Sequence, residues 1–198
     1  MLKRILCATL ASGALVLSGS AAAQELKIAL IAGKTGPLEA YAKDTEKGLM
    51  HGLEYLTNDT MALNGRKIRV IIKDDKLKPD LGKAMLAEAY ADDKVDIAVG
   101  TTSSGVALAM LPVAEEYKKV LIVEPAVADA ITGDKWNRYI FRTGRNSAQD
   151  GLASAATLMG GGSVAYLAQD YAFGRDGVKA GKEALAAVGS KARVVHEE

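Results

Sequence analysis

The sequence has 198 residues, of which 49% are hydrophobic, and its formal net charge is +1 at pH 7. This composition is typical of a globular protein with room for one complete domain and part of another. A charge so close to neutral argues against a nucleic-acid-binding protein, because such proteins usually present a strongly basic face.

The first 23 residues have the composition of a secretory signal peptide. Two basic residues precede an apolar run, Ile5 to Ala23, which ends on three alanines. This pattern predicts cleavage after Ala23, and an uncleaved membrane anchor is the alternative. The only cysteine, Cys7, lies inside this segment, so we expect a mature chain with neither a disulfide nor a cysteine nucleophile. An exported chain without disulfides fits the bacterial periplasm.

Strand and helix patterns alternate from Leu26 onward. The expected strands are Leu26–Ala32, Arg66–Lys73, Val95–Val99, Val120–Val123 and Arg138–Arg142. The expected helices are Tyr41–Asn58, Leu81–Asp92 and Val106–Tyr117, with a short helical turn at Ala128–Thr132. Apolar strands that alternate with helices predict a parallel sheet covered on both faces. We therefore expect a doubly wound α/β lobe over residues 24–143.

The pattern restarts after residue 143. Asn146 and Gln149 have the spacing of a capping box and predict a helix that runs to about Met159. A strand, a helix and a second strand are expected at Ser163–Ala168, Asp176–Val188 and Ala192–His196. Two strands and two helices are too few to complete a doubly wound lobe. Residues 144–198 are therefore predicted to begin a second, incomplete α/β lobe, and a single domain with a ragged end is the alternative.

Ligands of open α/β sheets bind beyond the carboxyl ends of the strands, so the loops at that edge are the candidate site. The predicted loops are Gly33–Tyr41, Asp74–Pro79, Gly100–Ser104, Glu124–Ala128 and, from the second lobe, Gln169–Phe173.

The sequence Gly100-Thr-Thr-Ser-Ser104 leads from a strand into a helix. The unbonded N–H groups at a helix start and the helix dipole favour an anion, and we expect Ser103 and Ser104 at the N-cap. This pattern predicts a carboxylate clamp made of hydroxyls and amides. The simpler interpretation is an ordinary N-cap, and the two remain open at this point.

Three aromatic residues, Tyr41, Tyr171 and Phe173, fall in the same set of loops or at helix starts beside them. Glu124 is a possible carboxylate in the cleft, although a solvated turn is the simpler interpretation. The pair Asp74-Asp75 is interpreted as a solvated turn, because adjacent residues at a strand end point in opposite directions.

The sequence does not indicate an enzyme. Its two histidines, His51 and His196, lie within the first helix and near the last residue, so neither is placed to activate Ser103 or Ser104. Nucleophile-elbow, phosphate-loop and dinucleotide-binding motifs are absent, as is a zinc-spaced set of cysteines and histidines. We expect no catalysis, no metal and no cofactor.

Six segments occur in an order and spacing that point to a known family. They are IALIAGKTGPLEAYAKDTEKG, KDDKLKP, VGTTSSG, EPAVADAIT, YIFRTGRNSAQDG and YLAQDYAFGRDG. Together with the signal peptide, they resemble the periplasmic substrate-binding proteins of ABC importers for branched-chain amino acids and related compounds. These are bilobed type I binding proteins with a Leu/Ile/Val-binding-protein-like domain. The resemblance covers almost all of Leu26 to Glu198.

The resemblance implies a solute receptor with ABC permease subunits as partners. The ligand carboxylate would contact Ser104, with Ser103 or Thr102 beside it, while the backbone carbonyl of Ala126 would meet the ligand and Tyr41 and Phe173 would wall the pocket. The two lobes would close about a hinge near Thr143–Arg145.

The chain departs from the family pattern at several positions. Ala128 stands where amino-acid binders often have a threonine that holds the amino-acid head group, and Phe173 stands where tyrosine is common. Leu77 and Ser103 occupy positions that carry a disulfide in some members. The loss of the hydroxyl at Ala128 leaves open an aromatic or other organic acid in place of an amino acid. A ligand-sensing module of a receptor or regulator with the same lobes is a further alternative.

Overall fold

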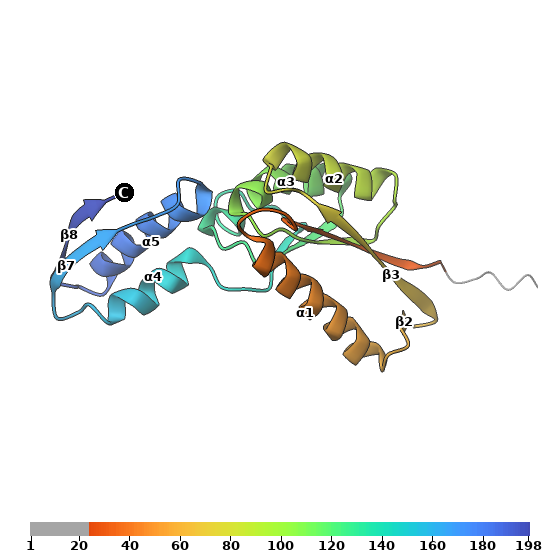
Figure 1. Cartoon of the computed structure of the whole chain (residues 1–198), viewed down its shortest axis with the longest axis horizontal. Helices are drawn as coiled ribbons and strands as arrows, with labels where there is room; N and C mark the ends of the chain where they lie inside the picture. The colour runs from red at the N-terminus through yellow and green to blue at the C-terminus, as the bar shows by residue number, and fades with distance from the viewer. Residues whose placement is uncertain (1–23) are drawn as a thin grey trace, which may run out of the picture.

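The computed structural model describes residues 24–198, so the expected signal peptide at residues 1–23 lies outside the described residues. The described chain forms a six-stranded sheet and, beyond it along the chain, a two-stranded sheet (Figure 1). We call the six-stranded sheet with its helices (residues 26–142) the first lobe. The elements that follow it (residues 147–197) are called the second lobe.

The six strands of the first lobe lie in the order β2-β3-β1-β4-β5-β6. They are β1 (Leu26–Ala32), β2 (Ala62–Leu63), β3 (Arg66–Asp74), β4 (Ile97–Gly100), β5 (Val120–Val123) and β6 (Ile140–Arg142). All neighbouring pairs are parallel except β2 with β3. The parallel α/β architecture predicted from the alternating pattern is therefore confirmed. The two-residue strand β2 was not predicted, because it is too short to show a periodicity.

Helices cover both faces of this sheet. They are α1 (Glu39–Thr57), α2 (Pro79–Ala91) and α3 (Ser104–Tyr117), and a 3₁₀ turn, η1 (Asp129–Ile131), follows β5. Successive side chains of β1 point to opposite faces. Leu30 packs in the cluster that includes Leu53 of α1, whereas Ile31 packs in the larger cluster that includes Leu86 of α2 and Met110 of α3. One helix therefore covers one face and two cover the other (Figure 1).

The second lobe contains two helices and two strands. They are α4 (Ser147–Ala156), β7 (Gly162–Tyr166), α5 (Ala172–Ala187) and β8 (Ala192–Glu197), and the two strands are parallel. The predicted capping box is confirmed, since the Asn146 side chain accepts from the Gln149 N–H at 2.9 Å and the Gln149 side chain accepts from the Asn146 N–H at 2.9 Å.

Helix α5 begins four residues earlier than predicted. Gly174 makes this possible, because a Cβ at that position would lie 2.0 Å from the Gln169 carbonyl oxygen. Only a glycine lets the preceding loop pack this closely against the first turn.

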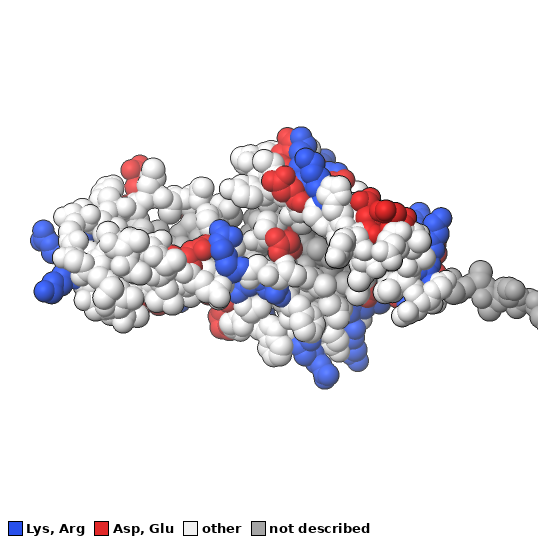
Figure 2. Space-filling model, turned by 90° about the horizontal axis from the view of Figure 1, so that it is seen from below, with Lys and Arg blue, Asp and Glu red and all other residues white. Residues whose placement is uncertain are grey.

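Charged side chains of both signs are interspersed over the first lobe, and the second lobe is largely uncharged on the face shown in Figure 2. Within residues 24–198, every helix is too short or too polar to cross a lipid bilayer.

Candidate functional site

One cavity of about 740 Å³ brings together all five loops predicted at the carboxyl ends of the strands. Its lining residues are Pro37, Leu38, Tyr41, Leu77, Pro79, Thr102, Ser103, Ser104, Gly105, Pro125, Val127, Arg145, Gln169, Tyr171 and Phe173. Both lobes contribute to this set. The volume is in the range of sites that bind small organic molecules.

Two hydroxyls, one in the loop after β4 and one on the first residue of α3, accept hydrogen bonds from backbone amides of neighbouring loops. Thr102 Oγ1 accepts a hydrogen bond from the Gly33 N–H at 3.2 Å, and Ser104 Oγ accepts one from the Ala128 N–H at 3.3 Å. Each hydroxyl accepts in these bonds and so keeps its own hydrogen to donate. Both residues line the cavity, so the loop offers hydrogen-bond donors there.

Ser103 is the N-cap residue of α3, but its side chain does not cap the helix. The N-cap position predicted for Ser103 is confirmed, although without a side-chain cap, whereas Ser104 is the first helical residue and accepts from the Ala128 N–H. The Ser103 hydroxyl lines the cavity, has no hydrogen-bond partner among residues 24–198, and belongs to a residue only 6% exposed. The first turn of α3 contains no acidic residue, so its dipole is left to act on the cavity.

Aromatic side chains form part of the cavity wall. The rings of Tyr171 and Phe173, at the start of α5, lie with their centroids 5.9 Å apart. Tyr41, on α1, is 61% exposed. Burial, with a smaller effect of Tyr41, raises the pKa of Tyr171 above 10, so its phenol stays neutral at physiological pH. The three aromatic residues named from the sequence thus share one cavity.

Arg145, which was predicted only as part of the hinge, is the residue that brings a positive charge to the cavity lining. Its Nε donates to both carboxylate oxygens of Asp150, at 2.7 and 2.9 Å. None of the residues that line the cavity is acidic. The only sequence signal for this role was an arginine between the last strand of the first lobe and the capping box.

Ala126 and Ala128 lie behind the cavity surface and are 3% and 1% exposed. Their neighbours Pro125 and Val127 line the cavity instead. The Ala128 N–H donates to Ser104, and its carbonyl accepts from Arg142 Nη1 at 2.8 Å. The ligand-binding roles given to Ala126 and Ala128 therefore stay predictions.

The pair Asp74-Asp75 is not a solvated turn. Asp75 is fully buried, its Oδ1 accepts the Leu77 N–H at 2.8 Å, and its Oδ2 accepts the Thr101 hydroxyl. Burial raises the pKa of Asp75, and the two hydrogen bonds offset only part of that effect. Burial alone would raise the pKa of Asp74 as well, but hydrogen bonds from Lys76, Thr35 and Lys34 lower it overall. Asp74 therefore accepts hydrogen bonds within a turn, whereas Asp75 is a buried carboxylic acid.

The other titratable residues considered from the sequence lie away from the cavity. Glu124 accepts a hydrogen bond from the Thr143 hydroxyl and lines a separate groove beside α1. His51 contacts Glu54 on α1 at 3.2 Å, and His196 lies on β8. Neither histidine lines the cavity with the serines. Within residues 24–198 no three His, Cys, Asp or Glu side chains are grouped to hold a metal ion.

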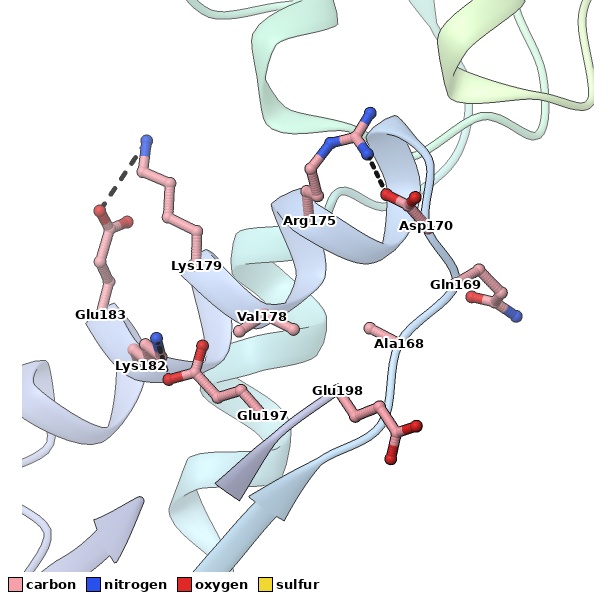
Figure 3. Close-up of a pocket in the computed structure, with 10 residues that line it drawn as sticks. All are labelled: Ala168, Gln169, Asp170, Arg175, Val178, Lys179, Lys182, Glu183, Glu197 and Glu198. Atoms are coloured by element: carbon pink, nitrogen blue, oxygen red, sulfur yellow. Dashed lines mark hydrogen bonds and ion pairs between the residues drawn. The ribbon is translucent and has the colours of Figure 1, made fainter. Parts of the chain in front are cut away.

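A second cavity, of about 640 Å³, lies between α5 and the end of β8 (Figure 3). Its charged side chains pair with one another: Arg175 contacts Asp170 at 2.6 Å, and Lys182 contacts Glu197. Because these charges compensate each other, this cavity does not present the one-sided set of donors that the first cavity has.

Comparison with known proteins identifies the family. The family model described as periplasmic binding protein matches residues 25–198. The chain belongs to the periplasmic binding protein family. Its members and the solved structures that resemble it are substrate-binding proteins rather than enzymes.

Three relatives show how much of a periplasmic binding protein this chain represents. A Leu/Ile/Val-binding protein homologue of Brucella melitensis is 28% identical over 73% of this chain and 39% of its own length. A branched-chain amino acid ABC transporter protein of Rhodopseudomonas palustris is 69% identical, with a TM-score of 0.72 over 88% of this chain and 47% of that one. A solute-binding protein of Rhodopseudomonas palustris in complex with 3,4-dihydroxybenzoic acid is 30% identical, with a TM-score of 0.72 over 88% and 46%. The chain spans less than half the length of each.

Proposed function

We propose that this chain carries part of a periplasmic solute-binding protein that delivers a small carboxylate to the permease subunits of an ABC importer. The observation that carries the proposal is the Ser103 hydroxyl: its residue is only 6% exposed and lines a cavity at the start of α3, and the hydroxyl does not cap that helix. Thr102 and Ser104 add donors beside it, and the lining also contains Arg145, whose Nε is paired with Asp150 outside the lining. An anion with a hydrophobic body matches this set of groups.

The donors alone do not account for tight binding. A contact with a helix N-terminus contributes about 0.3–2 kcal/mol, and a hydrogen bond to a charged group about 1.5–3 kcal/mol. A Kd of about 1 μM requires roughly 8 kcal/mol. We propose that the remainder comes from burial of the ligand against Tyr41 and Phe173 when two domains close about Thr143–Arg145. These domains, residues 24–143 and 144–198 as predicted from the sequence, contain the first and the second lobe.

Two ligand classes fit the proposal, and they differ in the groups that they need from the cavity. A branched-chain or other amino acid would be bound by its carboxylate and would need an acceptor for its ammonium group. We propose the carbonyl of Ala126 as one such acceptor, although no acidic residue lines the cavity. An aromatic acid needs no such acceptor, and its ring would pack against the aromatic side chains of the cavity wall. The second candidate is therefore a benzoate-like acid, the class bound by one of the solved relatives.

Calorimetry with L-leucine and with benzoate tests the proposal. We expect one of the two to bind and Ser103→Ala to weaken its binding about tenfold, since one hydrogen bond to the carboxylate is lost. Ser163→Ala is the matched control, because Ser163 is exposed on β7 and does not line the cavity. Equal affinities for wild type and Ser103→Ala would contradict the anion site. Stimulation of a reconstituted permease by the loaded protein would distinguish a transport component from a ligand sensor.

A further inference from the structure

Three loops of the first lobe meet beneath the candidate cavity, and one buried carboxylate joins two of them. The loops follow β1, β3 and β4, and they contain Gly33, Asp75 and Thr101 respectively. Asp75 is fully buried and does not line the cavity, so it cannot contact a ligand itself.

The two oxygens of Asp75 serve different loops. Oδ1 accepts the N–H of Leu77, whose side chain lines the cavity, at 2.8 Å. Oδ2 accepts the hydroxyl of Thr101, the residue directly before the Thr102–Ser104 donors. A single side chain therefore ties the apolar wall at Leu77 to the polar loop that precedes α3.

The third loop packs against the same contact. A Cβ at Gly33 would lie 2.1 Å from Leu77 Cδ2 and 3.4 Å from Asp75 Oδ1, so Leu77 rests directly on the Gly33 backbone. The Gly33 N–H in turn donates to Thr102 Oγ1 at 3.2 Å. Displacement of Leu77 or Thr101 would therefore shift the hydroxyl donors that face the cavity.

We infer that Asp75 is a positioning residue of the binding site: its buried carboxylate holds Leu77 and the Thr101–Ser104 loop in one fixed arrangement. The two contacts of Asp75 are features of the fold, and only the effect on affinity rests on the proposed function. A carboxylate suits the task because one group accepts from two donors on two loops. Asparagine keeps one acceptor oxygen in nearly the same volume, whereas alanine leaves both donors buried without a partner.

The test compares Asp75→Ala, Asp75→Asn and Thr101→Val with a control that is damaged elsewhere. Tyr90→Phe is the control, because it removes a 3.0 Å hydrogen bond to the Val120 carbonyl within the core and Tyr90 does not line the cavity. Amide hydrogen exchange at Leu77 and at Ser103–Gly105 measures, without any ligand, how firmly these backbone segments are held. Calorimetry with L-leucine and benzoate measures the affinity of the binding site.

We expect Asp75→Ala to speed exchange at these amides at least tenfold and to weaken binding of the accepted probe about tenfold. Thr101→Val should act in the same direction, and Asp75→Asn should recover most of the loss. Tyr90→Phe should leave both readouts near wild type even where it lowers the melting temperature equally. If Asp75→Ala does not fold, Thr101→Val and Asp75→Asn decide the question.

Unchanged exchange and unchanged affinity in Thr101→Val and Asp75→Ala would overturn the inference, as would an equal loss in Tyr90→Phe. If the wild type binds neither probe while exchange changes as expected, the proposed function fails and the positioning role of Asp75 stands.

Discussion

The two lobes differ in how completely each covers its apolar residues. In the first lobe, both faces of the sheet are packed, and Leu30 and Ile31 of β1 are fully buried on opposite sides. In the second lobe, the buried cluster is limited to Ala155, Ala184 and Leu185, and Val195 of β8 is 57% exposed. The hydroxyls of Thr102, Ser103 and Ser104 therefore stand on the well-packed lobe, whereas the less covered lobe supplies Tyr171 and Phe173. Precise placement is needed for hydrogen bonds and less so for apolar contact.

The comparison predicts the largest effect for a change beneath the polar loop. Gly100, at the end of β4, has φ +139°, and a Cβ there would lie 1.9 Å from the Ile31 carbonyl oxygen. We expect Gly100→Ala to destabilise the first lobe by about 3 kcal/mol or more, through strain and overpacking. Chemical denaturation followed by circular dichroism measures this loss.

Gly52→Ala provides the control for Gly100→Ala. Gly52 lies within α1, and no atom stands within 4 Å of a Cβ built there, so this variant should be as stable as the wild type or more so. Wild-type stability in Gly100→Ala would mean that the contact between Gly100 and Ile31 is less rigid than its packing indicates.

Much of this arrangement was predictable because it depends on local patterns. The alternation of apolar strand patterns with helical ones predicted five of the six strands of the first lobe, and the pair Asn146 and Gln149 predicted the start of α4. The convergence of the five loops followed from the general location of sites in parallel sheets. The three aromatic residues of the cavity wall were found for the same reason.

What the sequence could not predict depends on contacts between distant residues. Adjacent acids at a strand end do point in opposite directions, but the burial of Asp75 depends on Thr101, 26 residues away. Ser104 was expected at the N-cap, but it is already helical, and its hydroxyl accepts from the N–H of Ala128, 24 residues away. Each of these is a tertiary contact that local periodicity does not contain.

A change at the junction of the lobes should have an intermediate effect. Asn146→Ala removes the acceptor for the Gln149 N–H at the start of α4, and we expect a loss of about 1 kcal/mol in the stability of the second lobe. Amide hydrogen exchange, compared between α4 and the helices α1–α3, measures this loss of stability in each lobe separately. Ser154→Ala, an exposed position of the same helix, is the control. Equal losses in α1–α3 and α4 would show that the lobes unfold as one unit, contrary to the difference in their packing.

The smallest predicted effect is a gain, in the second lobe. Gly177 lies within α5, and no atom stands within 4 Å of a Cβ built there, so Gly177→Ala should stabilise the helix by about 0.5–1 kcal/mol. Gly174→Ala in the same helix should destabilise, because its Cβ would meet the Gln169 carbonyl oxygen at 2.0 Å. Denaturation of both variants checks the pair. If Gly177→Ala stabilises α5 and leaves ligand affinity unchanged, the aromatic wall tolerates a stiffer second lobe. A gain in stability with a loss of affinity would instead show that the wall must adjust as the ligand enters, so that the difference in packing between the lobes serves binding.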